Sequence, residues 1–100
     1  MAKNLIGKNW CDASDGRTIK ITNPATNELI DTVPESSNLD CDKAVEAAVE
    51  GQKEWAKKPI HERASILMKF VSLIEEHKDE LAKLLSDETG KPISEAIGEI

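Results

Sequence analysis

The chain has 100 residues, 39% of them hydrophobic and 32% charged, with a formal net charge of -6. This length allows one modest hydrophobic core, and the composition is that of a globular protein. The negative charge provides no source for the phosphate neutralisation that nucleic-acid binding requires, and no apolar run approaches the ~20 residues that span a bilayer. We therefore expect no nucleic-acid or membrane partner, and a cytoplasmic protein.

Residues 1–37 carry the signals of short strands and turns. Leu5-Ile6 and Trp10-Cys11 precede Asp15-Gly16, a dipeptide that readily takes the positive φ of tight hairpin turns, so a hairpin is expected there. Thr18 to Thr22 alternates with period two, which predicts a half-buried strand.

A turn and a further strand follow. The segment Asn23-Pro24-Ala25-Thr26-Asn27 predicts a turn, because proline fixes φ and asparagine tolerates the left-handed region. Leu29 to Val33 then predicts a strand closed by Pro34, which cannot donate to a ladder. A small antiparallel meander is the expected result.

From Asn38 onward the apolar residues recur with helical spacing. Asn38 or Asp40 can cap the first helix, and Pro59 ends it. Its apolar stripe consists of Ala44, Val45, Ala48, Val49 and Trp55. This helix is predicted to be amphipathic.

The second helix is expected from about Ile60 towards His77. Apolar side chains lie around most of its circumference, and a helix of this kind needs burial on nearly every side. These residues are Ile66, Leu67, Met68, Phe70, Val71, Leu73 and Ile74. A chain of this size has little with which to cover them, so we expect further polypeptide to pack there.

Two shorter helices complete the prediction. One runs from Asp79 to about Glu88 and ends at Gly90, the usual residue for a left-handed C-cap. Pro92 opens the other, which continues from Ser94 to Ile100 without a stop signal, so the sequence is expected to be the start of a longer chain. The predicted fold class is α+β: a β-hairpin or meander over residues 1–37, then about four helices over residues 38–100, within one domain or part of one.

The candidate reactive residues are scattered. Cys11 and Cys41 are expected to be reduced packing or surface thiols, and they do not combine with His61 and His77 at the paired spacings of a zinc site. A cysteine near a helix start, such as Cys41, can have a lowered pKa, but packing is the preferred interpretation. The acidic run of Glu75, Glu76, Asp79 and Glu80 could attract a cation or a basic partner, although such runs usually keep a helix face solvated.

Several short blocks, in their shared order, resemble the amino-terminal region of the aldehyde dehydrogenase superfamily. No single block is specific, but together they run along nearly the whole chain. Asn27 stands where that family commonly has glycine, a mild departure because asparagine also reaches positive φ. The blocks are Ile6-Gly7-Lys8-Asn9-Trp10, Ile21 to Thr26 with Glu28, Asp42 to Ala48 with Trp55, Glu62-Arg63-Ala64 with Ile66-Leu67, and Glu88-Thr89-Gly90-Lys91-Pro92 with Glu95-Ala96 and Glu99.

The resemblance implies the start of the α/β aldehyde dehydrogenase-like fold, and an enzyme that oxidises an aldehyde, such as a semialdehyde, to a carboxylic acid with NAD or NADP. The family's catalytic cysteine, glutamate base and dinucleotide turn lie beyond this sequence, so no catalytic or cofactor-binding residue is assigned, and the segment alone is expected to be inactive and to bind no cofactor. The resemblance also suggests a monovalent cation site at Thr22 and Glu99; an exposed helix carboxylate is the alternative for Glu99. The remainder of the polypeptide and a homo-oligomer are the partners it implies.

A second interpretation remains open. The chain could be a free-standing acidic helical module without catalytic activity, whose exposed apolar surface docks on a partner.

Overall fold

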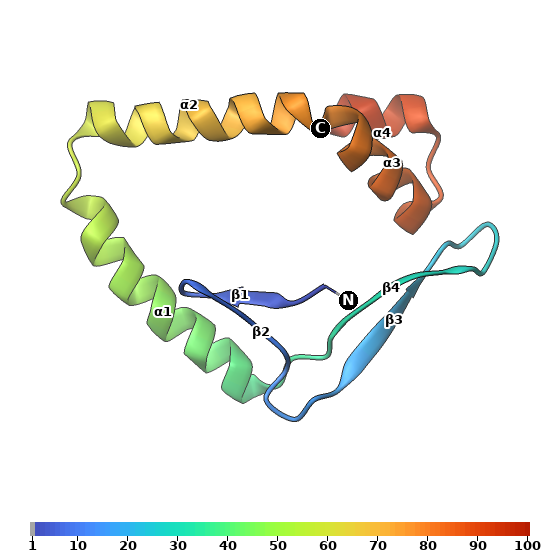
Figure 1. Cartoon of the computed structure of the whole chain (residues 1–100), viewed down its shortest axis with the longest axis horizontal. Helices are drawn as coiled ribbons and strands as arrows, with labels where there is room; N and C mark the ends of the chain where they lie inside the picture. Colours follow the sequence, from blue (N-terminus) through green and yellow to red (C-terminus); the bar gives the residue numbers. More distant parts are fainter. Residues whose placement is uncertain (1) are drawn as a thin grey trace. The chain divides into compact units, whose positions relative to one another are not determined.

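The computed structural model describes residues 2–100, which form four short strands followed by four helices (Figure 1). The strands are β1 (Asn4–Ile6), β2 (Asn9–Cys11), β3 (Thr18–Thr22) and β4 (Leu29–Pro34). The helices are α1 (Asn38–Ala56), α2 (Ile60–Glu76), α3 (Lys78–Thr89) and α4 (Ile93–Glu99). This order confirms the predicted α+β class, and each predicted helix is present within one or two residues of its expected ends.

The strands form two separate two-stranded sheets, β1 with β2 and β3 with β4, rather than one continuous meander. In the first pair, Asn4 lies opposite Cys11 and Ile6 opposite Asn9, so the hairpin turn is Gly7-Lys8. Gly7 has a φ of 63°, as a two-residue hairpin loop with glycine first requires. The hairpin turn therefore lies earlier in the chain than predicted.

Asp15-Gly16 does form a turn, with a φ of 72° at Gly16, but it links β2 to β3, which do not pair with each other. The Gly16 N–H donates to the carbonyl of Ala13 at 2.9 Å, and the Asp15 carboxylate accepts from the Arg17 N–H at 3.1 Å. The dipeptide correctly predicted the reversal. It carried no information on which strands pair across it, because β2 already has β1 as its partner.

The start of α1 differs from the prediction. The N-cap is Ser37, not Asn38 or Asp40, and Asp40 is the third helical residue. The Ser37 hydroxyl accepts from the Asp40 N–H, while the Asp40 carboxylate accepts from the Ser37 N–H, which together make a capping box. A serine followed three residues later by a carboxylate is the sequence signal for this arrangement, so it could have been identified without the structure.

The chain divides into two compact units, which we describe separately. The first comprises the segment ending at Lys20 together with Asp31–Pro59; the second comprises Ile21–Ile30 and Ile60–Ile100. In the first unit β1 packs against α1. In the second unit α3 packs against α4, and each of these helices buries one alanine completely, Ala82 and Ala96.

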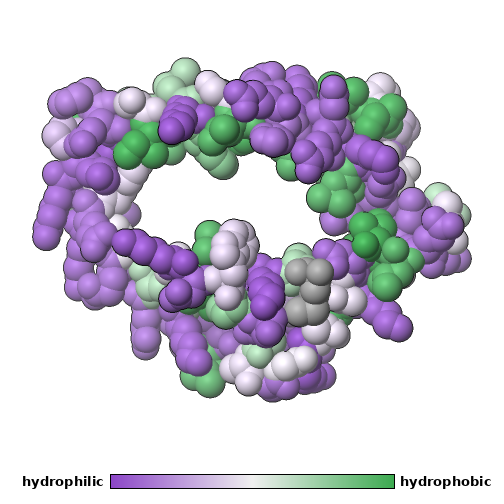
Figure 2. All heavy atoms as spheres, in the orientation of Figure 1, coloured by the Kyte–Doolittle hydropathy of each residue, from purple (hydrophilic) through white to green (hydrophobic). Residues whose placement is uncertain are grey.

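Among the described residues, the buried hydrophobic side chains are three alanines: Ala13, Ala82 and Ala96. Larger apolar side chains remain on the surface, most conspicuously along α2, which has no buried residue (Figure 2). None of the helices between residues 2 and 100 is both long and apolar enough to cross a membrane.

Candidate functional site

The segment after β3 forms a tightly hydrogen-bonded turn. The Asn23 side-chain oxygen accepts from the Ala25 N–H at 2.8 Å, and the Asn23 carbonyl accepts from the Asn27 N–H at 2.7 Å. The Asn23 N–H in turn donates to the carbonyl of Glu28 at 2.9 Å, which closes the loop. Asn27 has a φ of 62°, the left-handed conformation that the sequence anticipated at this position.

The junction between α3 and α4 is held in a similar way. Gly90 is the C-cap of α3, as predicted, with a φ of 77°, and its N–H donates to the Ser86 carbonyl. The Ser86 hydroxyl donates to the carbonyl of Lys91 at 2.7 Å. Pro92 occupies the N-cap of α4, and its carbonyl accepts from the N–H groups of Glu95 and Ala96.

The turn and the junction lie against each other. A Cβ placed on Gly90 would be 3.0 Å from Cγ of Pro24, which is too close for most real contacts. Glycine at this position therefore serves two purposes: it allows the left-handed backbone, and it leaves room for the proline ring. Two segments far apart in the sequence meet here within the second unit.

Of the two residues of the suggested cation site, Thr22 directly precedes the turn, whereas Glu99 lies at the end of α4 away from the junction. Thr22 is the last residue of β3, and Glu99 is the last residue of α4. Both side chains are exposed, and the Glu99 carboxylate pairs with the ammonium group of Lys91. Among the described residues, no hydrogen bond or ion pair joins Thr22 to Glu99. The Glu99 carboxylate is paired with the Lys91 side chain instead.

The first unit contains the one buried ionisable side chain found between residues 2 and 100, that of Asp40, which is 4% exposed. Its carboxylate accepts from the Ser14 N–H at 3.0 and 3.2 Å and from the Ser37 N–H at 2.9 Å. The hydroxyls of Ser14 and Ser37 lie 3.1 Å apart. The Ser37 N–H first, and then the Ser14 N–H, lower the pKa of Asp40 below its ordinary value of 3.8, because both stabilise the ionised form.

These contacts join the turn after β2 to the start of α1. The Asp40 carboxylate therefore has a structural role: it accepts hydrogen bonds from the backbone of both segments and holds them together. The sequence indicated only that Asp40 could cap the helix; its bond to Ser14 spans 26 positions and could not be read from local spacing.

Two depressions lie in the first unit. The larger, of about 540 Å³, is open to solvent and lies between the β1–β2 hairpin and α1, where Gly7 faces Ala47. It is lined mainly by small or aliphatic side chains, with Lys8, Glu50 and Glu54 as its charged groups. The smaller, of about 180 Å³, lies beside Asn4, Ser36 and Cys41. Neither gathers the nucleophile, base and oxyanion donors of a catalytic site.

The remaining candidate residues are separated from one another. Cys11 is half-buried in β2 and Cys41 is exposed in α1; both are free thiols. His61 is exposed at the start of α2. His77 occupies the N-cap position of α3 without a side-chain capping bond, and its Nδ1 lies 3.2 Å from the Glu80 carboxylate. Within residues 2–100, no three histidine, cysteine or carboxylate side chains are grouped so as to hold a metal ion.

Comparison with known proteins identifies the family of this chain. Residues 10–100 match the model of the aldehyde dehydrogenase family, and the chain belongs to that family. It is 46% identical over 98 residues to malonate-semialdehyde dehydrogenase 2 of Geobacillus kaustophilus, a match that covers 98% of this chain and 20% of the relative.

Solved structures agree. A putative methylmalonate-semialdehyde dehydrogenase of Sinorhizobium meliloti, complexed with NAD, matches with a TM-score of 0.85 and 41% identity over 95% of this chain and 19% of that one. NADP-dependent glyceraldehyde-3-phosphate dehydrogenase of Bacillus halodurans, complexed with NADP, matches with a TM-score of 0.93 and 34% identity over 98% and 21%. The chain thus spans about one fifth of the length of the relatives it matches.

Proposed function

We propose that this chain is the N-terminal part of the cofactor-binding domain of an NAD(P)-dependent aldehyde dehydrogenase that oxidises a semialdehyde to a carboxylic acid. The observation that carries the proposal is the match along residues 10–100 to the family, together with the 46% identity to a malonate-semialdehyde dehydrogenase. Residues 1–37 supply the strands and residues 38–100 the helices of that part. The parent enzyme is a cytoplasmic homo-oligomer.

The chain alone is expected to be inactive. Hydride transfer from an aldehyde requires a nucleophile, a base and a bound nicotinamide in one pocket. The thiols of Cys11 and Cys41 have no histidine or carboxylate among their hydrogen-bond partners in the described residues. The role of the chain is therefore to support the site from outside it.

The test uses a chimera. In malonate-semialdehyde dehydrogenase 2 of Geobacillus kaustophilus, the matched residues would be replaced by those of this chain, and reduction of NAD and of NADP would be followed with malonate semialdehyde as substrate. We expect activity within about tenfold of the parent, because the replaced part holds no reacting group. The isolated chain and a parent from which the segment is deleted are the controls, both expected to be inactive. A well-folded but inactive chimera, or an active isolated chain, would contradict the proposal.

We also propose that Thr22 and Glu99 contribute to a monovalent cation site, through the Thr22 carbonyl and the Glu99 carboxylate. Support comes from the contact of Pro24, two residues after Thr22, with Gly90, and from the pairing of Glu99 with Lys91, the residue after Gly90. Lys91 competes for the same carboxylate, so the cation and the ammonium group would share it.

In the chimera, potassium chloride should raise the thermal unfolding midpoint relative to choline chloride at equal ionic strength, since binding to the folded state alone stabilises it. Glu99→Gln should abolish that difference, while Glu95→Gln on the same helix should preserve it. A difference that survives Glu99→Gln would remove Glu99 from the site.

A further inference from the structure

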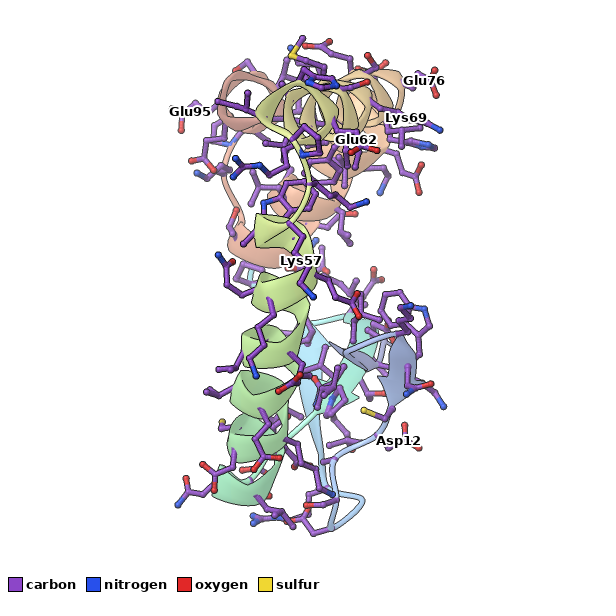
Figure 3. All side chains as sticks on the ribbon, turned by 90° about the vertical axis from the view of Figure 1, so that its left-hand side faces the viewer. Asp12, Lys57, Glu62, Lys69, Glu76 and Glu95 are labelled. Carbon is purple, nitrogen blue, oxygen red and sulfur yellow. The ribbon has the colours of Figure 1, made fainter. Side chains whose placement is uncertain are left out.

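Helix α2 is apolar on two sides that point almost in opposite directions. At about 100° per residue, its apolar side chains are spread over roughly 220° of the circumference, from Leu73 round to Met68, with Arg63 and Glu75 as the charged residues inside that arc. The polar side is the narrow remainder: Figure 3 shows Glu62, Lys69 and Glu76 on one side of the helix. Phe70 and Met68 lie roughly 160° apart on the two flanks of the apolar part.

Both flanks are open in this chain. Phe70 is 59% and Met68 64% exposed, and Ile66, Val71 and Leu73 are exposed as well. Leu67, on the ridge between the flanks, is 54% exposed. A surface helix that packs on one core needs an apolar stripe of only ~100°, so one neighbouring element cannot cover both Phe70 and Met68.

We infer that α2 is held between two separate surfaces, and that both belong to the polypeptide which the family relatives carry outside the part that this chain matches. This inference rests on the proposed function. Two observations identify the occupant. The relatives have about five times the matched length, since the match covers 20% of them. The matched part also adopts the same conformation in a chain of that length, with a TM-score of 0.93. Each surface must be mainly apolar. Arg63 lies about 20° from Phe70 and Glu75 about 20° from Met68, so each surface must also accommodate one charged side chain near an end of the helix.

The experiment compares single lysine substitutions in two settings. Phe70→Lys tests one flank, Met68→Lys the other, and Ser65→Lys, on the exposed polar side, is the matched control. In the isolated chain all three should leave helix content and the unfolding midpoint nearly unchanged, because these side chains are already in water. This also shows whether each variant still folds.

In the chimera, both flank variants should lower the thermal unfolding midpoint by at least about 4 °C, because each places a charge inside a packed apolar surface. Ser65→Lys should change it by less than about 1 °C. If the unfolding midpoint fell for only one of the two flank variants, α2 would dock on one side only and the inference would be overturned. It would also be overturned if the midpoint fell for neither. An equal loss in the isolated chain would show that this chain covers the flank itself, which also overturns it.

Failure of the proposed function would look different. A chimera that shows both flank effects but no dehydrogenase activity would contradict the function and keep the two-sided packing. A chimera that is active, but whose unfolding midpoint is unchanged by Phe70→Lys and Met68→Lys, would support the function and contradict the two-sided packing.

Discussion

The turns and helix ends of this chain, which we call its joints, differ from helix α2 in how far their interactions are satisfied within the chain. The joints are the turns and helix ends at residues 13–16, 23–28, 36–40 and 86–92. Hydrogen bonds within the chain hold them: the Asp40 carboxylate accepts from the N–H groups of Ser14 and Ser37, and the Gly90 N–H donates to the Ser86 carbonyl. Along α2 the backbone is helical, but most of the apolar side chains are exposed to solvent.

The difference shows that local geometry and burial are specified separately. Turns and caps need a few polar atoms and permissive backbones within reach, and these are present in the sequence. Burial needs area from other elements, and the buried hydrophobic residues described here are only three alanines. The joints should therefore be sensitive to substitution in the isolated chain, and α2 should not.

The largest effect is expected at Gly90. Gly90→Val would impose a β-branched side chain on a φ of 77° and drive its Cβ to 3.0 Å from the Pro24 ring. We expect the free energy of unfolding to fall by about 2–3 kcal/mol, measured by urea titration. Gly51→Ala in α1 is the matched control, because nothing lies within 4 Å of its Cβ position; alanine should be neutral or stabilise the helix by up to about 1 kcal/mol. Equal behaviour of the two variants would refute the special role of Gly90.

A smaller effect is expected at Ser37. Ser37→Ala removes the hydroxyl that accepts from the Asp40 N–H and interacts with Ser14. The loss should be about 1 kcal/mol, seen as reduced helix content and earlier unfolding in urea. Ser65→Ala, within α2, should show no comparable loss because alanine is the better helix former. If both serines behaved alike, the capping box would not contribute to stability.

The Asp40 joint should also respond to acid. Its pKa is lower in the folded chain than its ordinary value of 3.8, so folding favours the ionised form. The stability it contributes is fully present above that ordinary value and is lost as the pH falls through the folded pKa. Unfolding measured between about pH 5 and pH 2 should become easier on the acid side, and less steeply so in Asp40→Asn.

Asp42→Asn, an exposed carboxylate on the same helix, is the control and should keep the steep response. Some acid sensitivity will remain in Asp40→Asn, since the Thr32 N–H lowers the pKa of Asp31 as well. Identical pH profiles for the parent and Asp40→Asn would exclude Asp40 from the acid response.

The sequence predicted most of the helices because their signals are local. Pro59, Gly90 and the spacing of apolar residues mark helix ends and faces within a few positions, and Asn27 does take the left-handed backbone anticipated for it. Strand pairing was harder to predict, because Gly7-Lys8 and Asp15-Gly16 are both plausible hairpin turns. Only the register of β1 on β2 distinguishes them.

The contacts that hold the candidate sites join residues far apart in the sequence, and no local sequence pattern predicts them. Pro24 and Gly90 meet although 66 positions separate them, and Ser14 reaches Asp40 across 26. The suggested pair Thr22 and Glu99 came from family resemblance and stays a prediction. The pairing of Glu99 with Lys91 was not foreseen, since lysine and glutamate eight residues apart are not neighbours on a regular helix.

The smallest effect is expected on α2. It tests whether the exposed apolar residues of this helix contribute little to the stability of the isolated chain. Leu67→Gln replaces an apolar side chain that is 54% exposed with a polar one of similar length and helix propensity. The free energy of unfolding of the isolated chain should change by no more than about 0.5 kcal/mol, and its solubility should rise, because an exposed apolar patch becomes smaller. Ala82→Gln in α3, at a position that is 0% exposed, should be far more costly in the same titration. A loss at Leu67 as large as that at Ala82 would mean that α2 is already covered within these 100 residues, and the contrast between joints and helix would disappear.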